Sequence, residues 1–248
     1  MFNMNFDSEM RISAIIPVHN EEGNVIAVYQ ELKEILQKIT LDFEIIFIDD
    51  GSQDATLSQL LSLKPKEENL RIIKFARNYG KSAALTAGFA HVKGDSVITL
   101  DGDGQDDPNN IPNLVKALTE ESDVVCGWRV NRKDRYLKKL YSKVYNFLNR
   151  RINRINVHDS NCMLRVYRKE VISGLILPKG AHRYIPIILS KRGYRITEIE
   201  VIHRSRLTGK SSYGFKRLFS GFLDLFRFRS LDKNIQPVHI VEKKYGFD

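Results

Sequence analysis

The chain has 248 residues, of which 42% are hydrophobic and 28% charged, so it is long enough for one large α/β domain with its own core. Residues 1–128 carry 11 Lys and Arg against 21 Asp and Glu, a net charge of −10, whereas residues 129–230 carry 25 against 6, a net charge of +19. No apolar run approaches the roughly 20 residues that span a bilayer, and Cys126 and Cys162 follow no metal or redox spacing, which favours a cytoplasmic protein.

The first half of the chain alternates short β-branched runs with stretches of helical periodicity. The predicted strands are residues 11–18, 43–49, 70–76, 96–100 and 123–127. The predicted helices are residues 23–39, 54–63, 81–91 and 110–120, with Asn20, Ser52 or Asp54, and Asp107 as candidate starts. Near-continuous apolar runs of this length are typical of strands that are covered on both faces. The pattern therefore predicts a doubly wound, mostly parallel sheet.

The second half has a different pattern. Residues 136–152 predict a basic amphipathic helix, residues 194–203 alternate like a strand, and residues 203–213 form a basic loop. Residues 215–228 place Phe215, Leu218, Phe219, Phe222, Leu223 and Phe226 on one helical face with lysine and arginine on its flanks. This apolar stripe suits a bilayer interface, the core of the protein itself or a membrane-embedded partner subunit.

Unusual polar residues follow three of the predicted strands, at residues 17–22, 49–52 and 101–107. In an open parallel sheet the ligand lies beyond the carboxyl ends of the strands, so we expect the active site there. The sequence DGDGQDDP begins at Asp101. A lone pair of aspartates spaced in this way is most often a solvated turn. Directly after a buried strand, and with glycines that permit a turn, Asp101, Asp103 and Gln105 instead predict a Mg²⁺ or Mn²⁺ site.

The other two segments also have two interpretations. Asp49, Asp50 and Ser52 suit a helix-capping turn, but a carboxylate at this position can also accept hydrogen bonds from a nucleobase or ribose. Lys81 begins a predicted helix, where a cation is unfavourable for the helix dipole unless an anion binds there.

Several segments together resemble the family 2 glycosyltransferases with the GT-A fold. They are IIPVHNEEGNV, FIDDGSQDAT, ARNYGKSAALTAGF, LDGDGQDDP, GWR, NCMLRVYRKEV, HRYIPIIL and HRSRLTGKSSY, and the resemblance runs from about residue 11 to about residue 228. Within this family the chain is similar to the dolichyl- and undecaprenyl-phosphate sugar synthases. The resemblance implies one catalytic domain over residues 1–230, with a donor and metal half at 11–128, a basic acceptor half at 129–230 and a tail at 231–248.

The resemblance also implies roles for individual residues. The nucleotide-sugar donor, linked to UDP or GDP, would contact Pro17, His19, Glu21, Asp49, Asp50, Lys81, Asp101, Arg206 and Lys210. The acceptor phosphate would contact Arg129, Lys138 and Ser142. Lys138 stands where the synthases keep an arginine, and it lacks the bidentate fork. Asp103, Arg129 and Asp159 are the candidate catalytic residues.

These implications predict an inverting transfer of a sugar to a polyprenyl phosphate at the cytoplasmic face of a membrane. Many bacterial synthases of this kind continue into membrane-spanning helices, whereas this sequence ends in NIQPVHIVEKKYGFD, so we expect peripheral binding through residues 215–228. A phosphate acceptor is already ionised and needs no strong general base. The main alternative is a soluble transferase acting on a sugar hydroxyl, with Asp159 as base. A nucleic-acid-binding protein would leave DGD unexplained, and a catalytically silent scaffold would not need these carboxylates.

Overall fold

The computed structural model describes residues 10–130, 157–204 and 242–247. Its strands are β1 Ile12–Val18, β2 Phe43–Asp49, β3 Leu70–Phe75, β4 Ser96–Thr99, β5 Val124–Trp128, β6 Arg165–Arg168, β7 Ile196–Glu200 and β8 Glu242–Tyr245. Its helices are α1 Val25–Gln37, α2 Thr56–Leu63, η1 Lys64–Lys66, α3 Lys81–Phe89, η2 Pro108–Asn110, α4 Ile111–Lys116, α6 Lys169–Ile172, η3 Ala181–Tyr184 and α7 Ile185–Lys191. The five strands and four helices predicted for the first half are confirmed, with ends that shift by a few residues.

The strands form one mixed sheet in the order β7-β5-β6-β4-β1-β2-β3-β8. Strands β1 to β4, β5 and β7 run in one direction, because β1 pairs in parallel with β2 and β4, β2 with β3, and β5 with β7. Strands β6 and β8 run against their neighbours. The sheet is therefore mostly parallel, as the sequence predicts.

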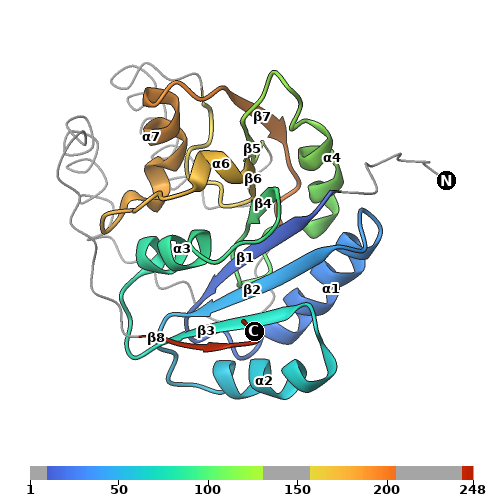
Figure 1. Ribbon diagram of the computed structural model, residues 1–248, viewed down its shortest axis with the longest axis vertical. Coiled ribbons are helices and arrows are strands. Elements are labelled where there is room, and N and C mark those ends of the chain that lie inside the picture. Colours follow the sequence, from blue (N-terminus) through green and yellow to red (C-terminus); the bar gives the residue numbers. More distant parts are fainter. Residues whose placement is uncertain (1–9, 131–156, 205–241, 248) are drawn as a thin grey trace.

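Helices cover both faces of the sheet (Figure 1). Alternate residues of each central strand point to opposite faces: Ile12, Ala14 and Ile16 pack in the core under α1, α2 and α4, whereas Ile15 packs in the core under α3, α6 and α7. All seven residues of β1 are buried. Burial on both faces explains why the strands are near-continuous apolar runs rather than alternating ones.

Two strands lie in segments for which no strand was predicted. Strand β6 inserts antiparallel between β4 and β5, and β8 pairs antiparallel with β3 over four residues. Beyond β8, Phe247 packs edge-on against His91 and beneath Arg71. Residues 242–247, which were expected within a tail after residue 230, therefore add an edge strand to the sheet beside β3.

Helix α1 starts later than Asn20, which was a candidate start. Asn24 precedes the first helical residue. Asn20 adopts a positive φ of 55°, and its side chain accepts a hydrogen bond from the Gln53 amide at 2.8 Å. Asn20 thus joins two loops instead of capping a helix. Asp107 does cap the short helix η2, through the Asn109 amide at 2.9 Å.

No helix in residues 10–130, 157–204 and 242–247 is long and apolar enough to cross a membrane. The predicted basic helix 136–152 and the predicted stripe 215–228 lie outside these residues. Their interfacial role stays a prediction.

Candidate active site

The carboxyl ends of β1, β2 and β4 meet at one edge of the sheet. Val18 at the end of β1 lies opposite Asp49 at the end of β2, and Ile15 of β1 lies opposite Thr99 at the end of β4. The polar segments that follow these strands are thereby brought side by side, as expected from their positions in the sequence.

Hydrogen bonds join the loop after β1 to the loop after β2 and to the start of α2. The Asn20 amide donates to Ser52 Oγ at 3.0 Å, and the Glu21 amide donates to Thr56 Oγ1 at 2.8 Å. Pro17 is buried within β1, His19 is exposed and Glu21 is half-buried. The predicted base and ribose residues therefore share one rigid wall, with His19 open to solvent.

The two aspartates after β2 have different surroundings. Asp49 is fully buried; its Oδ1 accepts from the Ser52 amide at 3.0 Å, and its Oδ2 has no hydrogen-bond partner among the described residues. Asp50 accepts from the amides of Tyr79 and Gly80 at 2.7 and 2.9 Å. Burial raises the pKa of the Asp50 carboxyl, although these two amides oppose the change. Within the described part of the chain, Asp49 thus keeps one carboxylate oxygen without a hydrogen bond, whereas Asp50 holds the loop before α3.

Lys81, the first residue of α3, reaches the aspartate loop after β4. Its Nζ lies 2.5 Å from Asp101 Oδ1. Burial and the neighbouring carboxylates of Asp106 and Asp103 raise the pKa of Asp101, while Lys81 opposes this effect. The positive charge of Lys81 therefore offsets only part of the negative charge that the carboxylates concentrate at this loop.

Hydrogen bonds within the aspartate loop fix its turn. Asp103 is buried and accepts from the Gln105 amide at 3.2 Å, while Asp106 Oδ2 accepts from the Asp101 amide at 3.0 Å. His203 Nδ1 lies 3.8 Å from Asp106 Oδ1. Burial raises the pKa of Asp106, but His203 and the Asp101 amide outweigh it, so the pKa lies below its ordinary value.

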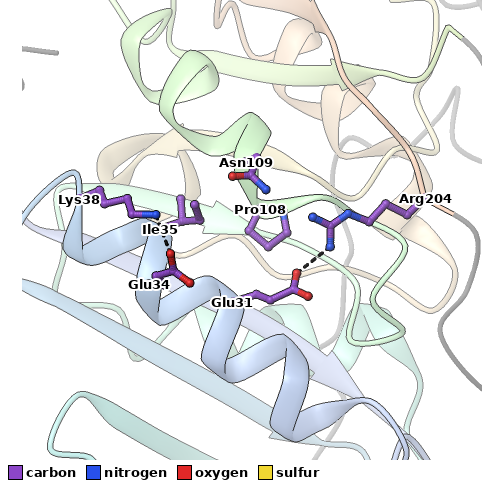
Figure 2. Close-up of a pocket in the computed structure, with 7 residues that line it drawn as sticks. All are labelled: Glu31, Glu34, Ile35, Lys38, Pro108, Asn109 and Arg204. Atoms are coloured by element: carbon purple, nitrogen blue, oxygen red, sulfur yellow. Dashed lines mark hydrogen bonds and ion pairs between the residues drawn. The ribbon is translucent and has the colours of Figure 1, made fainter. Parts of the chain in front are cut away.

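Arg204 fastens the chain after β7 to the same loop. Its amide donates to the Gln105 carbonyl at 2.9 Å, and its guanidinium contacts both Asp107 and Glu31 of α1 at 2.7 Å. Figure 2 shows a small pocket between α1 and η2 that Arg204 helps to line. Its volume of about 130 Å³ is below the usual 300–1,000 Å³ of a ligand site, and its charged residues are already paired. We therefore assign it no ligand.

Arg129 and Asp159 form a buried ion pair beyond the end of β5. Arg129 Nε and Nη2 donate to the two carboxylate oxygens of Asp159 at 2.7 and 3.0 Å, and the side chains are 9% and 4% exposed. Burial would lower the pKa of Arg129, but Asp159 holds it above its ordinary value. The arginine is thus a fixed cation, and both oxygens of Asp159 are bonded to it.

The residues of the aspartate loop suit a divalent cation. Hard oxygen ligands are clustered there, and burial, together with repulsion from Asp106 and Asp103, raises the pKa of Asp101. Within the described ranges no group of three or more His, Cys, Asp or Glu forms a complete cage. Mg²⁺ usually needs only one or two carboxylates when substrate phosphates supply the other ligands. Asp101, Asp103 and Gln105 therefore fit a metal that is shared with a diphosphate.

Four predicted site residues, Lys138, Ser142, Arg206 and Lys210, lie outside the described ranges. Their roles stay predictions. The other predicted site residues lie in the segments at or just beyond the carboxyl ends of β1, β2, β4 and β5, at the amino end of α3, and in the loop paired with Arg129.

The model of the glycosyl transferase family 2 matches residues 13–175. The chain belongs to this family. It is 37% identical over 216 residues to the undecaprenyl-phosphate 4-deoxy-4-formamido-L-arabinose transferase of Serratia proteamaculans, covering 87% of this chain and 66% of that protein. It is also 37% identical to the dodecaprenyl-phosphate galacturonate synthase of Rhizobium johnstonii, covering 87% and 65%. The chain thus spans about two thirds of the length of these relatives.

Among solved structures, glucosyl-3-phosphoglycerate synthase from Mycobacterium tuberculosis, in complex with Mn²⁺, UDP and phosphoglyceric acid, is similar with a TM-score of 0.69. The sequence identity is 18%, and the similarity covers 95% of this chain and 89% of that one. This similarity confirms the GT-A fold.

Sequence reasoning missed three residues that shape the site of this glycosyltransferase. No individual role was predicted for Arg204, Glu198 or Arg165, and Arg165 is fully buried on β6. Arginine and glutamate are rarely buried without a partner, so composition alone favours the surface for each. The one available signal was the position of Arg204, directly after the strand predicted at 194–203 and at the start of the recognised motif HRSRLTGKSSY.

Proposed function

We propose that this glycosyltransferase moves a sugar from a nucleoside-diphosphate sugar to a polyprenyl phosphate, with inversion at the anomeric carbon. The similarity to polyprenyl-phosphate sugar transferases supports this acceptor. The Arg129–Asp159 pair is the observation in the site that carries it. A phosphate nucleophile needs a cation to position it, whereas a hydroxyl nucleophile needs a free base. Here the carboxylate beside the arginine has both oxygens engaged.

The donor would bind along the edge formed by the β1, β2 and β4 loops. Oδ2 of buried Asp49 has no partner among the described residues and can accept a hydrogen bond from the base or ribose. Pro17, His19 and Glu21 line the same wall. Asp50 would act indirectly, because it orders the backbone of Tyr79 and Gly80 that leads to Lys81. Lys81 would balance charge between Asp101 and the donor phosphates.

Asp101, Asp103 and Gln105 would hold Mg²⁺ or Mn²⁺ together with the donor diphosphate. When bound, such an ion stabilises the negative charge that develops on the departing nucleoside diphosphate. Arg206 and Lys210 would add positive charge over the same phosphates. Lys138 and Ser142 would bind the acceptor phosphate with Arg129.

The lipid acceptor requires the enzyme to reach a membrane surface. We propose peripheral binding at the cytoplasmic face through the apolar stripe 215–228, directly or through a membrane-embedded partner subunit. Each lysine or arginine near an anionic surface contributes about 1 kcal/mol, and salt screens this contribution. We expect salt-sensitive flotation with anionic liposomes, weakened by Phe222→Asp in a protein that still folds. Unfolding by that substitution would instead assign the stripe to the core.

The acceptor assignment is tested with the purified chain, Mn²⁺ and a panel of UDP- and GDP-linked sugars. Each donor is offered undecaprenyl phosphate in detergent or a free oligosaccharide, and products are identified by mass spectrometry. We expect a sugar-phosphate lipid from one donor and no transfer to the oligosaccharide. Transfer only to the oligosaccharide would favour the soluble alternative, with Asp159 as base. Asp103→Ala is the inactive control.

A further inference from the structure

The loop that carries Asp159 is held by Glu198 on one side. Glu198 projects from β7 and its side chain is 8% exposed. Its Oε2 accepts from the His158 amide at 2.7 Å and its Oε1 from the Asp159 amide at 3.0 Å. Oε2 also lies 2.9 Å from His158 Nδ1. One carboxylate thus fixes two consecutive peptide groups at the base of the Arg129 pair.

The same loop is held on another side by Arg165. Arg165 is the first residue of β6, lies opposite Thr99 and Cys126, and is fully buried. Its Nη2 donates to the Ser160 carbonyl at 2.7 Å, and its Nη1 donates to the His182 carbonyl and Tyr167 Oη at 3.3 Å. Arg165 therefore joins the Asp159 loop to η3.

The burial of Arg165 has no evident benefit for stability. No carboxylate of the described residues pairs with it, and its buried Nε has no hydrogen-bond partner there. A buried charge without an opposite charge is costly, and an apolar side chain of similar size commonly packs at least as well. What the guanidinium supplies, and an apolar group could not, is directed donors that set the path of the loop backbone.

Trp128 reports on this loop directly. It is the last residue of β5, immediately precedes Arg129, and stacks on His158 with ring centroids 4.3 Å apart and an interplanar angle of 16°. His158 is in turn fixed by Glu198. Trp128 is the single tryptophan of the chain, so intrinsic fluorescence reads this one position.

We propose that Glu198 and Arg165 are positioning residues that clamp the 158–160 loop, so that Asp159 holds Arg129 in the orientation that receives the acceptor phosphate. This assignment rests on the proposed role of Arg129. The clamp acts on the acceptor side and leaves the donor wall of β1, β2 and β4 untouched. Loss of either clamp residue therefore weakens use of the acceptor and spares nucleotide binding.

The test compares Arg165→Met and Glu198→Gln with the wild-type chain. Glu198→Gln removes one of the two acceptor oxygens, and Arg165→Met removes all the directed donors while keeping the volume. We expect acrylamide quenching of Trp128 to rise in both variants. We expect kcat/KM for undecaprenyl phosphate to fall about ten- to a hundredfold, the size of effect that a misplaced group produces. Binding of UDP and of GDP with Mn²⁺, measured by calorimetry, stays within about twofold of wild type.

Two further variants separate positioning from simple stability. Arg168→Met removes a more exposed arginine from the same strand. Among the described residues, its side chain donates a hydrogen bond only to the Thr119 carbonyl, at 2.8 Å. This variant should match wild type in quenching and kinetics. Arg165→Lys keeps the charge and one donor, so it should recover part of the acceptor activity and stands in for Arg165→Met if that variant does not fold.

Folded variants with unchanged Trp128 quenching and unchanged acceptor kinetics would overturn the clamp. A parallel loss of nucleotide affinity would also overturn it, because the effect would then extend to the donor wall. If the wild type itself makes no sugar-phosphate lipid, the proposed function fails. In that case the quenching comparison still decides whether Glu198 and Arg165 hold the loop.

Discussion

Asp159→Ala tests the energetic consequence of breaking the Arg129–Asp159 pair, and it also removes the acceptor of the Asn161 amide at 3.3 Å. The substitution leaves the Arg129 guanidinium, 9% exposed, without its bidentate partner. Removing one member of a buried ion pair typically costs 3–5 kcal/mol, because the remaining charge is neither paired nor solvated. Asp106 also stabilises the charge of Arg129 and should keep the cost near the lower end, at about 3 kcal/mol.

The assay is urea unfolding followed by circular dichroism, with thermal unfolding alongside. At this chain length each kcal/mol lowers the melting temperature by about 2–4 °C, so the variant should melt about 6–12 °C below wild type. The matched control is the double variant Arg129→Met, Asp159→Leu, which removes both charges and should retain most of the stability while losing transfer. A loss of less than about 1 kcal/mol in Asp159→Ala would refute the burial argument, because Arg129 would then be solvated on its own.

Three other predictions follow from single sites. Asp103→Ala should abolish transfer with Mn²⁺ present. It should lower the melting temperature by about 2–4 °C, because it removes the acceptor of the Gln105 amide but no apolar core contact. Retention of more than a few per cent of metal-dependent activity would contradict the metal assignment. Gly51→Ala should lower the free energy of unfolding by at least about 2 kcal/mol, since the φ of Gly51 is 69° and a Cβ would lie 2.4 Å from the backbone after β3. Gly174 has a similar φ of 68° but open space around the Cβ position, so Gly174→Ala should cost about 1 kcal/mol. Equal costs would contradict the clash. The hydrogen bonds from Arg195 lower the pKa of Asp123 to about 2. The free energy of unfolding of wild type should therefore exceed that of Asp123→Asn by about 1 kcal/mol at pH 7, after discounting for the exposed arginine, and this difference should vanish as the pH falls from about 4 to about 2. A difference that persists at pH 2 would contradict the linkage.

The sequence was sufficient for the central sheet because its signals were redundant. Strands β1 to β5 are apolar runs separated by helical periodicity, and only a covered, mostly parallel sheet satisfies both. Strand β8 could not be predicted in this way. Its sequence EKKY has no apolar alternation, and its position depends on pairing with the edge of β3, a contact distant in the chain.

The positions of candidate site residues could be predicted where short motifs follow strands. Contacts between a side chain and backbone that is distant in the sequence could not. Asp49 ends β2, and Asp101 and Asp103 follow β4, so the positions of these candidate residues could be predicted from local sequence. The clamps at Arg165 and Glu198 depend on β6 and β7 lying beside β5, which no local pattern encodes. Asp50 was assigned near the donor from the resemblance, and its contacts support instead an ordering role through the Tyr79 and Gly80 amides.

The most direct test of the central claim is the chemistry of the product. The lipid product of the active donor is isolated, and its anomeric configuration and phosphorus linkage are determined by proton and phosphorus nuclear magnetic resonance. A sugar joined through its anomeric carbon to the polyprenyl phosphate, with configuration opposite to that of the donor, is the result predicted here. Retained configuration, or a glycosidic bond to a hydroxyl instead of a phosphate ester, would contradict it.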